Sequence, residues 1–154
     1  MRERRETLDN DQHLITQVQD KLHEIANDVM YHGTSTANAM SIMSHGFVSS
    51  HHGLLGYGVY LASEEKAENF ARDAKNRGKG DGATILMCSY HAPRIAIAVT
   101  AEEAEDDWQD SYDAMWVGST SRSTRPELCI ANAANVVVIG YKYLGETEYR
   151  NPHC

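Results

Sequence analysis

The sequence has no long apolar run, which excludes helical membrane proteins from the classes to consider. None of its 154 residues lies in a stretch that approaches the roughly 20 consecutive apolar residues needed to span a bilayer. The N-terminus, MRERRE, is charged and has no apolar segment after it, so we do not expect a secretory signal peptide.

Paired cysteines are also missing. Three cysteines, Cys88, Cys129 and Cys154, stand far apart and show no paired spacing. Cys88 and Cys129 lie inside apolar runs, which is typical of buried thiols in a reducing compartment. We therefore expect a cytoplasmic protein, with the nucleus as the alternative.

Positive charge is scarce. The chain has 14 Lys and Arg against 22 Asp and Glu, which gives a net charge of −8. Affinity for nucleic acid comes largely from cationic contacts with phosphates, so general nucleic-acid binding is disfavoured, although a local basic patch could still act. The hydrophobic content of 42% and the charged content of 23% are ordinary for a soluble globular protein.

No internal repeat or linker divides the chain, so its length indicates one domain. Residues 1–28 read as an N-terminal helical extension packed on this domain, because apolar residues between Asp9 and Asp28 recur at helical spacing. Residues 29–144 form the domain proper. Residues 145–154 are polar and are expected to fray.

The predicted elements favour an α+β fold. Helices are expected over Thr36–Ser44, which Gly46 would end, and from Ser63 to about Asn76. The strands from Ala83 onward follow one another without helical crossovers, apart from an acidic stretch. Antiparallel pairing of the strands is therefore expected.

Three short motifs attract attention in this framework: HGT (32–34) at the end of one predicted strand, GVYLA (58–62) at a second and ELCI (127–130) at a third. Their combination resembles the catalytic domain of the PARP-like, or diphtheria-toxin-like, ADP-ribosyltransferases, which have a His-Tyr-Glu triad on three such strands. The text between the motifs is similar too, including ANAMSIMSHGF, LLGYGVYLASEEKAENFA, SYDAMWVGS and PELCIANAANVVVIGYKYL. The match covers roughly residues 29–144.

The resemblance implies an ADP-ribosyltransferase-like fold, a central antiparallel split sheet with flanking helices, and NAD+ as the co-substrate. It implies that the His32 side chain hydrogen-bonds the adenosine ribose. The backbone of Gly33 would hold the nicotinamide carboxamide, where a Cβ would obstruct close approach. Thr34 completes the motif and is counted among the NAD+-binding residues.

The nicotinamide ring would pack against Tyr60, and Phe70 on the next helix would close the sandwich. Glu127 would hydrogen-bond the nicotinamide ribose and stabilise the oxocarbenium-like transition state. The resemblance thus makes His32, Tyr60 and Glu127 the catalytic residues. In isolation, Phe70 could simply be the core face of its helix, and Glu127 a solvated residue at a strand edge.

One departure from the family concerns Ala67, which stands where a serine usually contacts the carboxamide. A lost hydrogen bond is typically worth about 0.5–1.5 kcal/mol, so weaker NAD+ binding is expected. The loop between Gly46 and Gly56 is short, which favours transfer of a single ADP-ribose over polymer synthesis. Polymer synthesis stays an alternative, because the polymer-making members of the family share the glutamate at the position of Glu127.

Other clusters have ordinary explanations. His45, His51 and His52 lack evident further ligands, so no metal is expected. Arg122 and Arg125 flank the glutamate motif and could meet pyrophosphate or acceptor.

The sequence therefore predicts a monomeric NAD+-dependent ADP-ribosyltransferase that modifies a protein acceptor, including itself as a candidate. Two rivals remain. One is an inactive, PARP-like NAD+-binding or interaction module, which NAD+ turnover would separate. The other is a transferase acting on nucleic-acid ends, which the acidic charge disfavours.

Overall fold

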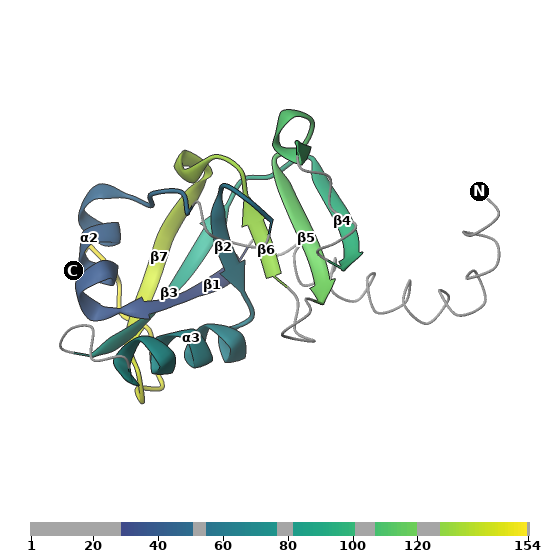
Figure 1. The fold of residues 1–154 in the computed structure, drawn as a ribbon. Helices are drawn as coiled ribbons and strands as arrows, with labels where there is room; N and C mark the ends of the chain where they lie inside the picture. The colour runs from purple at the N-terminus through teal and green to yellow at the C-terminus, as the bar shows by residue number, and fades with distance from the viewer. Residues whose placement is uncertain (1–28, 51–54, 77–81, 101–106, 120–126, 154) are drawn as a thin grey trace.

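The computed structural model describes residues 29–50, 55–76, 82–100, 107–119 and 127–153. They form an α+β domain in which two helices pack on a mixed sheet of seven strands (Figure 1). The predicted N-terminal helix lies outside these residues. Within the described part of the chain, no helix is long and apolar enough to cross a membrane.

The helices and strands alternate early in the chain, and the strands then follow one another. In chain order the elements are β1 (Val29–Ser35), α2 (Thr36–His45), β2 (Val59–Ala62), α3 (Glu64–Asn76), β3 (Ala83–Tyr90), β4 (Ile95–Thr100), η2 (Trp108–Asp110), β5 (Ala114–Ser119), β6 (Glu127–Ile130), η3 (Ala133–Asn135) and β7 (Val136–Tyr143). The strands are arranged in the order β4-β5-β6-β2-β1-β3-β7. The two predicted helices therefore exist, and the predicted α+β class is confirmed.

The helix boundaries follow from the expected capping residues. Ser35 caps α2, because its Oγ accepts a hydrogen bond from the backbone N–H of Asn38 at 3.2 Å. Gly46 ends α2 with a φ of 88°, a left-handed conformation that glycine adopts without steric cost. Ser63 caps α3 in the same way, through the backbone N–H of Lys66.

The expectation of antiparallel pairing throughout is wrong at one edge of the sheet. β4 and β5 pair in parallel, with Ile95 opposite Ala114, whereas the other pairs are antiparallel. Two parallel strands need a crossover of roughly a dozen or more residues between them. Residues 101–113, the acidic stretch and η2, supply that length.

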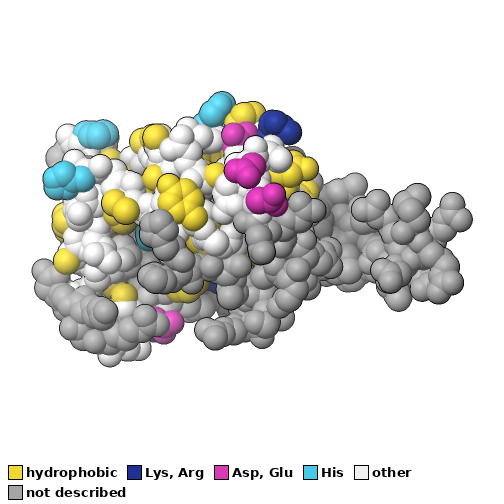
Figure 2. All heavy atoms as spheres, turned by 45° about the horizontal axis from the view of Figure 1, so that its top comes forward, with side chains coloured by type: hydrophobic (Ala, Val, Ile, Leu, Met, Phe, Trp, Pro, Cys, Tyr) yellow, Lys and Arg dark blue, Asp and Glu magenta, His cyan; other side chains and the backbone are white. Residues whose placement is uncertain are grey.

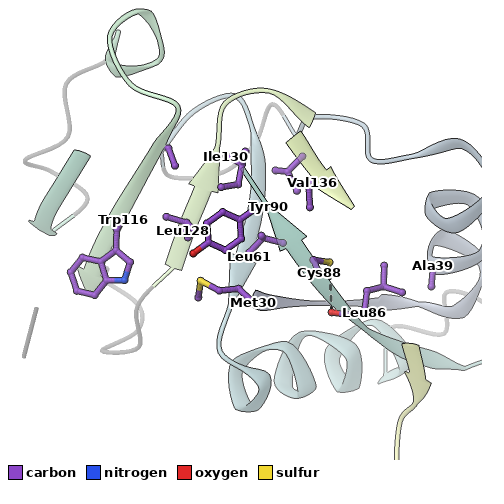
Figure 3. Packing of buried hydrophobic residues seen from close by; sticks show 12 residues of the cluster. Met30, Ala39, Leu61, Leu86, Cys88, Tyr90, Trp116, Leu128, Ile130 and Val136 are labelled. Atoms are coloured by element: carbon purple, nitrogen blue, oxygen red, sulfur yellow. Dashed lines mark hydrogen bonds between the residues drawn. The ribbon is translucent and has the colours of Figure 1, made fainter. Parts of the chain in front are cut away.

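The main core lies between the strands and α2. Figure 3 shows its side chains converging from β1, β2, β3 and β6, with Trp116 further along the sheet on β5. The fully buried side chains include Leu61, Leu86, Leu128 and Ile130. Both predicted buried thiols are confirmed, since Cys88 and Cys129 are free and have no exposed surface.

The opposite face is covered by α3, which packs very close to β1. Ala67 and Ala71 of α3 are fully buried, and a Cβ built on Gly33 would lie 1.8 Å from the backbone oxygen of Ala67. The helix itself therefore requires glycine at position 33. The family resemblance implies that glycine is needed here for the approach of a ligand, and helix packing is a second, independent reason.

The prediction that the C-terminal tail frays is wrong for residues 145–153. The backbones of Tyr141 and Arg150 exchange two hydrogen bonds of 2.7 and 3.0 Å. The hydroxyl of Tyr149 donates to Glu64 of α3 at 2.6 Å, and the Nζ of buried Lys142 lies 4.9 Å from the Tyr149 ring centroid. The tail is ordered because its aromatic ring and polar groups fasten α3 to β7.

Candidate active site

The three motifs lie on neighbouring strands, since β6, β2 and β1 are adjacent in the sheet. Ala62 of β2 lies opposite Tyr31 on one side and opposite Glu127 on the other. Directly paired residues present their side chains on the same face. Tyr60, two residues before Ala62, therefore shares a face with Glu127, and this is the face that α3 covers.

β1 and β2 are joined by one residue pair, Tyr31 with Ala62, and the two strands then diverge (Figure 1). His32 follows directly after that pair, so its side chain belongs to the other face of β1. Its ring packs edge-on against Phe47, with centroids 5.2 Å apart. His32 still reaches across the divergence, because its Nδ1 lies 2.9 Å from the backbone oxygen of Tyr60.

This contact fixes the tautomer of the neutral His32 ring. A carbonyl oxygen can only accept, so Nδ1 must donate the proton, and in the neutral ring Nε2 has the lone pair. Burial lowers the pKa of His32 below its ordinary value, and the hydrogen bond to Tyr60 opposes this only in part. At neutral pH, His32 is thus a neutral imidazole with an acceptor at Nε2.

The Tyr60 side chain is tied to the loop that precedes its own strand. Its hydroxyl accepts from the backbone N–H of Leu55 at 2.8 Å and donates to the backbone oxygen of Gly56 at 2.5 Å. Burial, with smaller contributions from Cys129 and Glu127, raises the pKa of Tyr60, so the phenol stays neutral. The ring packs against the cluster formed by Leu55, Ala98, Trp108, Met115, Val117 and Cys129.

Glu127 faces a cation that none of the three sequence motifs contains. Its Oε2 lies 3.7 Å from the Nζ of Lys66 in the first turn of α3, and the side chains are 12% and 8% exposed. Ion pairs this enclosed are lightly screened by solvent. The signal available in the sequence was position alone: Lys66 directly precedes Ala67, in the segment already matched to the family.

Phe70 lies one turn further along α3 and is 44% exposed. The Lys66 Nζ lies 5.8 Å from the centroid of the Phe70 ring, so α3 presents a cation and an aromatic ring together. The described aromatic contacts include none between Phe70 and Tyr60.

Thr34 stands on β1, and its hydroxyl accepts from the Asn38 side chain at 3.3 Å.

The remaining surface is mixed in character. Figure 2 shows acidic side chains together at the β4–β5 end of the face, with a histidine and a basic side chain beside them, and further histidines at the α2 end. Among the described residues, no group of three or more His, Cys, Asp and Glu side chains could hold a metal ion. His51, His52, Arg122 and Arg125 lie outside the described residues.

Comparison with protein families gives a match that spans the whole domain. The family described as Poly(ADP-ribose) polymerase catalytic domain matches residues 6–150. The chain belongs to this family. A search of curated proteins returned no match. Membership in the PARP catalytic family supports ADP-ribosyltransferase chemistry with NAD+ as the substrate, and the seven-stranded α+β sheet is consistent with such a domain.

Proposed function

We propose that this PARP-family domain is an active enzyme that transfers one ADP-ribose unit from NAD+ to a protein acceptor, with His32, Tyr60 and Glu127 as its catalytic residues. The supporting observation is that these residues stand on three adjacent strands, with His32 bonded to the Tyr60 carbonyl where β1 and β2 diverge. The short segment between Gly46 and Gly56 favours transfer of a single unit.

NAD+ binds along β1 in this proposal. The neutral His32 ring accepts a hydrogen bond from a hydroxyl of the adenosine ribose at Nε2, and Gly33 and Thr34 continue the contact toward nicotinamide. The nicotinamide ring packs between Tyr60 and Phe70. The exposed Phe70 ring is suited to that task, because offset stacking on a flat ligand removes apolar surface from water.

The reaction breaks the bond between the ribose anomeric carbon and the nicotinamide nitrogen. The bonding electrons leave with the ring, which becomes neutral nicotinamide, and positive charge develops on the ribose. The Glu127 carboxylate stabilises that charge. The acceptor nucleophile attacks the opposite face, forms the new bond and releases its proton to water. Lys66 holds the carboxylate in place through their ion pair.

An inactive binding module is the second candidate, and Ala67 favours it. Ala67 has no exposed surface and no side-chain donor, so the nicotinamide carboxamide loses one partner there. A binding module and a slow enzyme share this weaker site. NAD+ turnover separates them.

The test is incubation of the purified protein with labelled NAD+, alone and with candidate acceptors, followed by mass spectrometry. We expect nicotinamide release and a mass increase of one ADP-ribose on an acceptor. In parallel, nicotinamide at millimolar concentration or a tight benzamide analogue should raise the melting temperature, because a ligand that binds only the native state stabilises it. Ligand binding without turnover would support the inactive module. Neither binding nor turnover would contradict both candidates.

A further inference from the structure

The segment Leu55–Tyr57 is held by side chains from the adjacent strand β2 and from the distant helix η2. Besides the two hydrogen bonds to the Tyr60 hydroxyl, the indole N–H of Trp108 donates to the Leu55 oxygen at 2.8 Å. The Gln109 amide nitrogen lies 3.1 Å from the Tyr57 oxygen and 3.4 Å from the Leu55 oxygen. Four backbone groups of three consecutive residues are thus bonded by side chains.

The Trp108 bond is well protected from solvent. Trp108 is 3% exposed, Leu55 is buried beside it, and 53 residues separate the two along the chain. Leaving either buried partner unpaired costs the desolvation of a polar group, so this contact strongly defines where the segment lies. Gly58 limits movement at the other end, since a Cβ there would lie 2.4 Å from the Cys129 Sγ.

These contacts extend to the candidate active site through Tyr60. Its hydroxyl is bonded to the segment, and its backbone oxygen accepts the hydrogen bond from His32. A shift of Leu55 or Gly56 must therefore move the phenol oxygen or break its hydrogen bonds. Trp108 and Gln109 of η2 therefore influence the position of the Tyr60 ring indirectly, because they bind the segment to which the Tyr60 hydroxyl is bonded.

We propose that Trp108 and Gln109 are positioning residues, which fix Leu55–Tyr57 and so hold the Tyr60 ring in the orientation that binds nicotinamide. The inference rests on the proposed function for the identity of the ligand. Neither residue belongs to a motif of the family resemblance. A loop held in its bound conformation lowers the ordering cost of binding, so the effect should be on affinity.

The test variant is Gln109→Leu, which removes the amide and leaves a branched apolar side chain that is one atom shorter. Asn132→Ala is the control, because the Asn132 side chain also bonds a backbone group, the N–H of Ala134 in the short helix η3, and none of the described hydrogen bonds joins it to Leu55–Tyr57. Three quantities are measured on the full chain: nicotinamide affinity by calorimetry, the kinetics of NAD+ turnover, and hydrogen exchange of the Leu55 amide, which donates to the Tyr60 hydroxyl.

In Gln109→Leu we expect nicotinamide to bind roughly three- to tenfold more weakly, the effect of one lost hydrogen bond. KM for NAD+ should rise in parallel, with kcat within about twofold, because a ground-state contact has been weakened. Exchange of the Leu55 amide should accelerate. Trp108→Phe should act in the same direction, and Asn132→Ala should leave all three quantities unchanged.

Unchanged nicotinamide affinity in both η2 variants would overturn the inference, whether or not exchange accelerates. A fall in kcat at constant KM and constant affinity would also overturn it. The wild-type protein separates this failure from that of the proposed function. If the wild type binds neither nicotinamide nor NAD+, the proposed function fails and the inference fails with it.

Discussion

The two ends of the candidate site are built from different interactions. At one end, His32 is a neutral, partly buried ring hydrogen-bonded to the Tyr60 carbonyl. At the other, Glu127 and Lys66 form an ion pair with little solvent exposure. Neutral hydrogen bonds are suited to holding a substrate equally in ground and transition states. A fixed charge acts most strongly where charge develops, so the Glu127 end should govern the rate.

The substitution Glu127→Gln tests this contrast with the largest expected effect. Glutamine keeps the size of the side chain but removes its charge. Preorganised electrostatic groups are typically worth about 10²–10³ in rate, so we expect kcat for transfer to fall by that order. NAD+ affinity, measured by calorimetry on the same protein, should change only a few-fold. Full activity in this variant would contradict the assignment of Glu127.

The ion pair adds a control for this experiment. Glu127→Gln removes the negative charge that faces the Lys66 ammonium, so a loss of stability could be mistaken for a loss of chemistry. The double variant Lys66→Met/Glu127→Gln removes both charges and should recover stability. Its activity should stay low. Recovered activity would mean that the single variant had lost its structure, not its catalytic charge.

Lys66→Met alone should be the most destabilising single change proposed for the site. Removing one partner of a buried pair typically costs about 3–5 kcal/mol, because the remaining charge is left without compensation. The pair here is 8% and 12% exposed, so we expect a value at or below the lower end of that range. Urea unfolding measures it. Lys66→Arg keeps the positive charge, so its free energy of unfolding should fall much less. Equal stability of all three proteins would mean that the pair contributes nothing.

The sequence predicted the elements that bear the site well, because local patterns determine them. Ser35, Gly46 and Ser63 mark the helix ends, and the apolar strands around Tyr60 and Glu127 form as expected. The family motifs then indicated three strands, β1, β2 and β6, that should lie together. These strands are neighbours in the sheet.

The contacts between these elements could not be predicted in the same way. Lys66 is an ordinary helical lysine in the sequence, and only the packing of α3 brings it to Glu127. Trp108 likewise finds its partner 53 residues away. The parallel pairing of β4 and the order of the tail around Tyr149 also depend on long-range contacts. No periodicity or capping residue encodes which distant polar groups will meet.

A smaller effect is expected at the other end of the site. His32→Ala should raise KM for NAD+ by about two- to thirteenfold, the equivalent of a hydrogen bond worth 0.5–1.5 kcal/mol. Because the proposed partner of His32 is remote from the breaking bond, kcat should change less than KM. Steady-state kinetics measures both, with His45→Ala, a change at an exposed residue at the end of α2, as the control. A collapse of kcat at unchanged KM would show that His32 acts on the chemistry itself.

The smallest expected effect is on the pH dependence of stability. Burial lowers the pKa of His32 below its ordinary value of 6.5, whereas the unfolded chain keeps that ordinary value. As the pH falls through 6.5, the unfolded state therefore binds a proton that the native state does not, and the free energy of unfolding decreases until the native ring also becomes protonated. Above pH 6.5, His32 should not make the free energy of unfolding depend on pH.

The chain has 8 histidines, so the contribution of one must be isolated by difference. Urea midpoints of the wild type and of His32→Gln at about pH 7.5, 6.5 and 5.5 provide that difference, since glutamine does not titrate in this range. The wild type should lose more stability than the variant between the two lower pH values. A wild type that loses less would mean that His32 is charged in the native state, and the proposed acceptor at Nε2 would then have to be replaced by a donor.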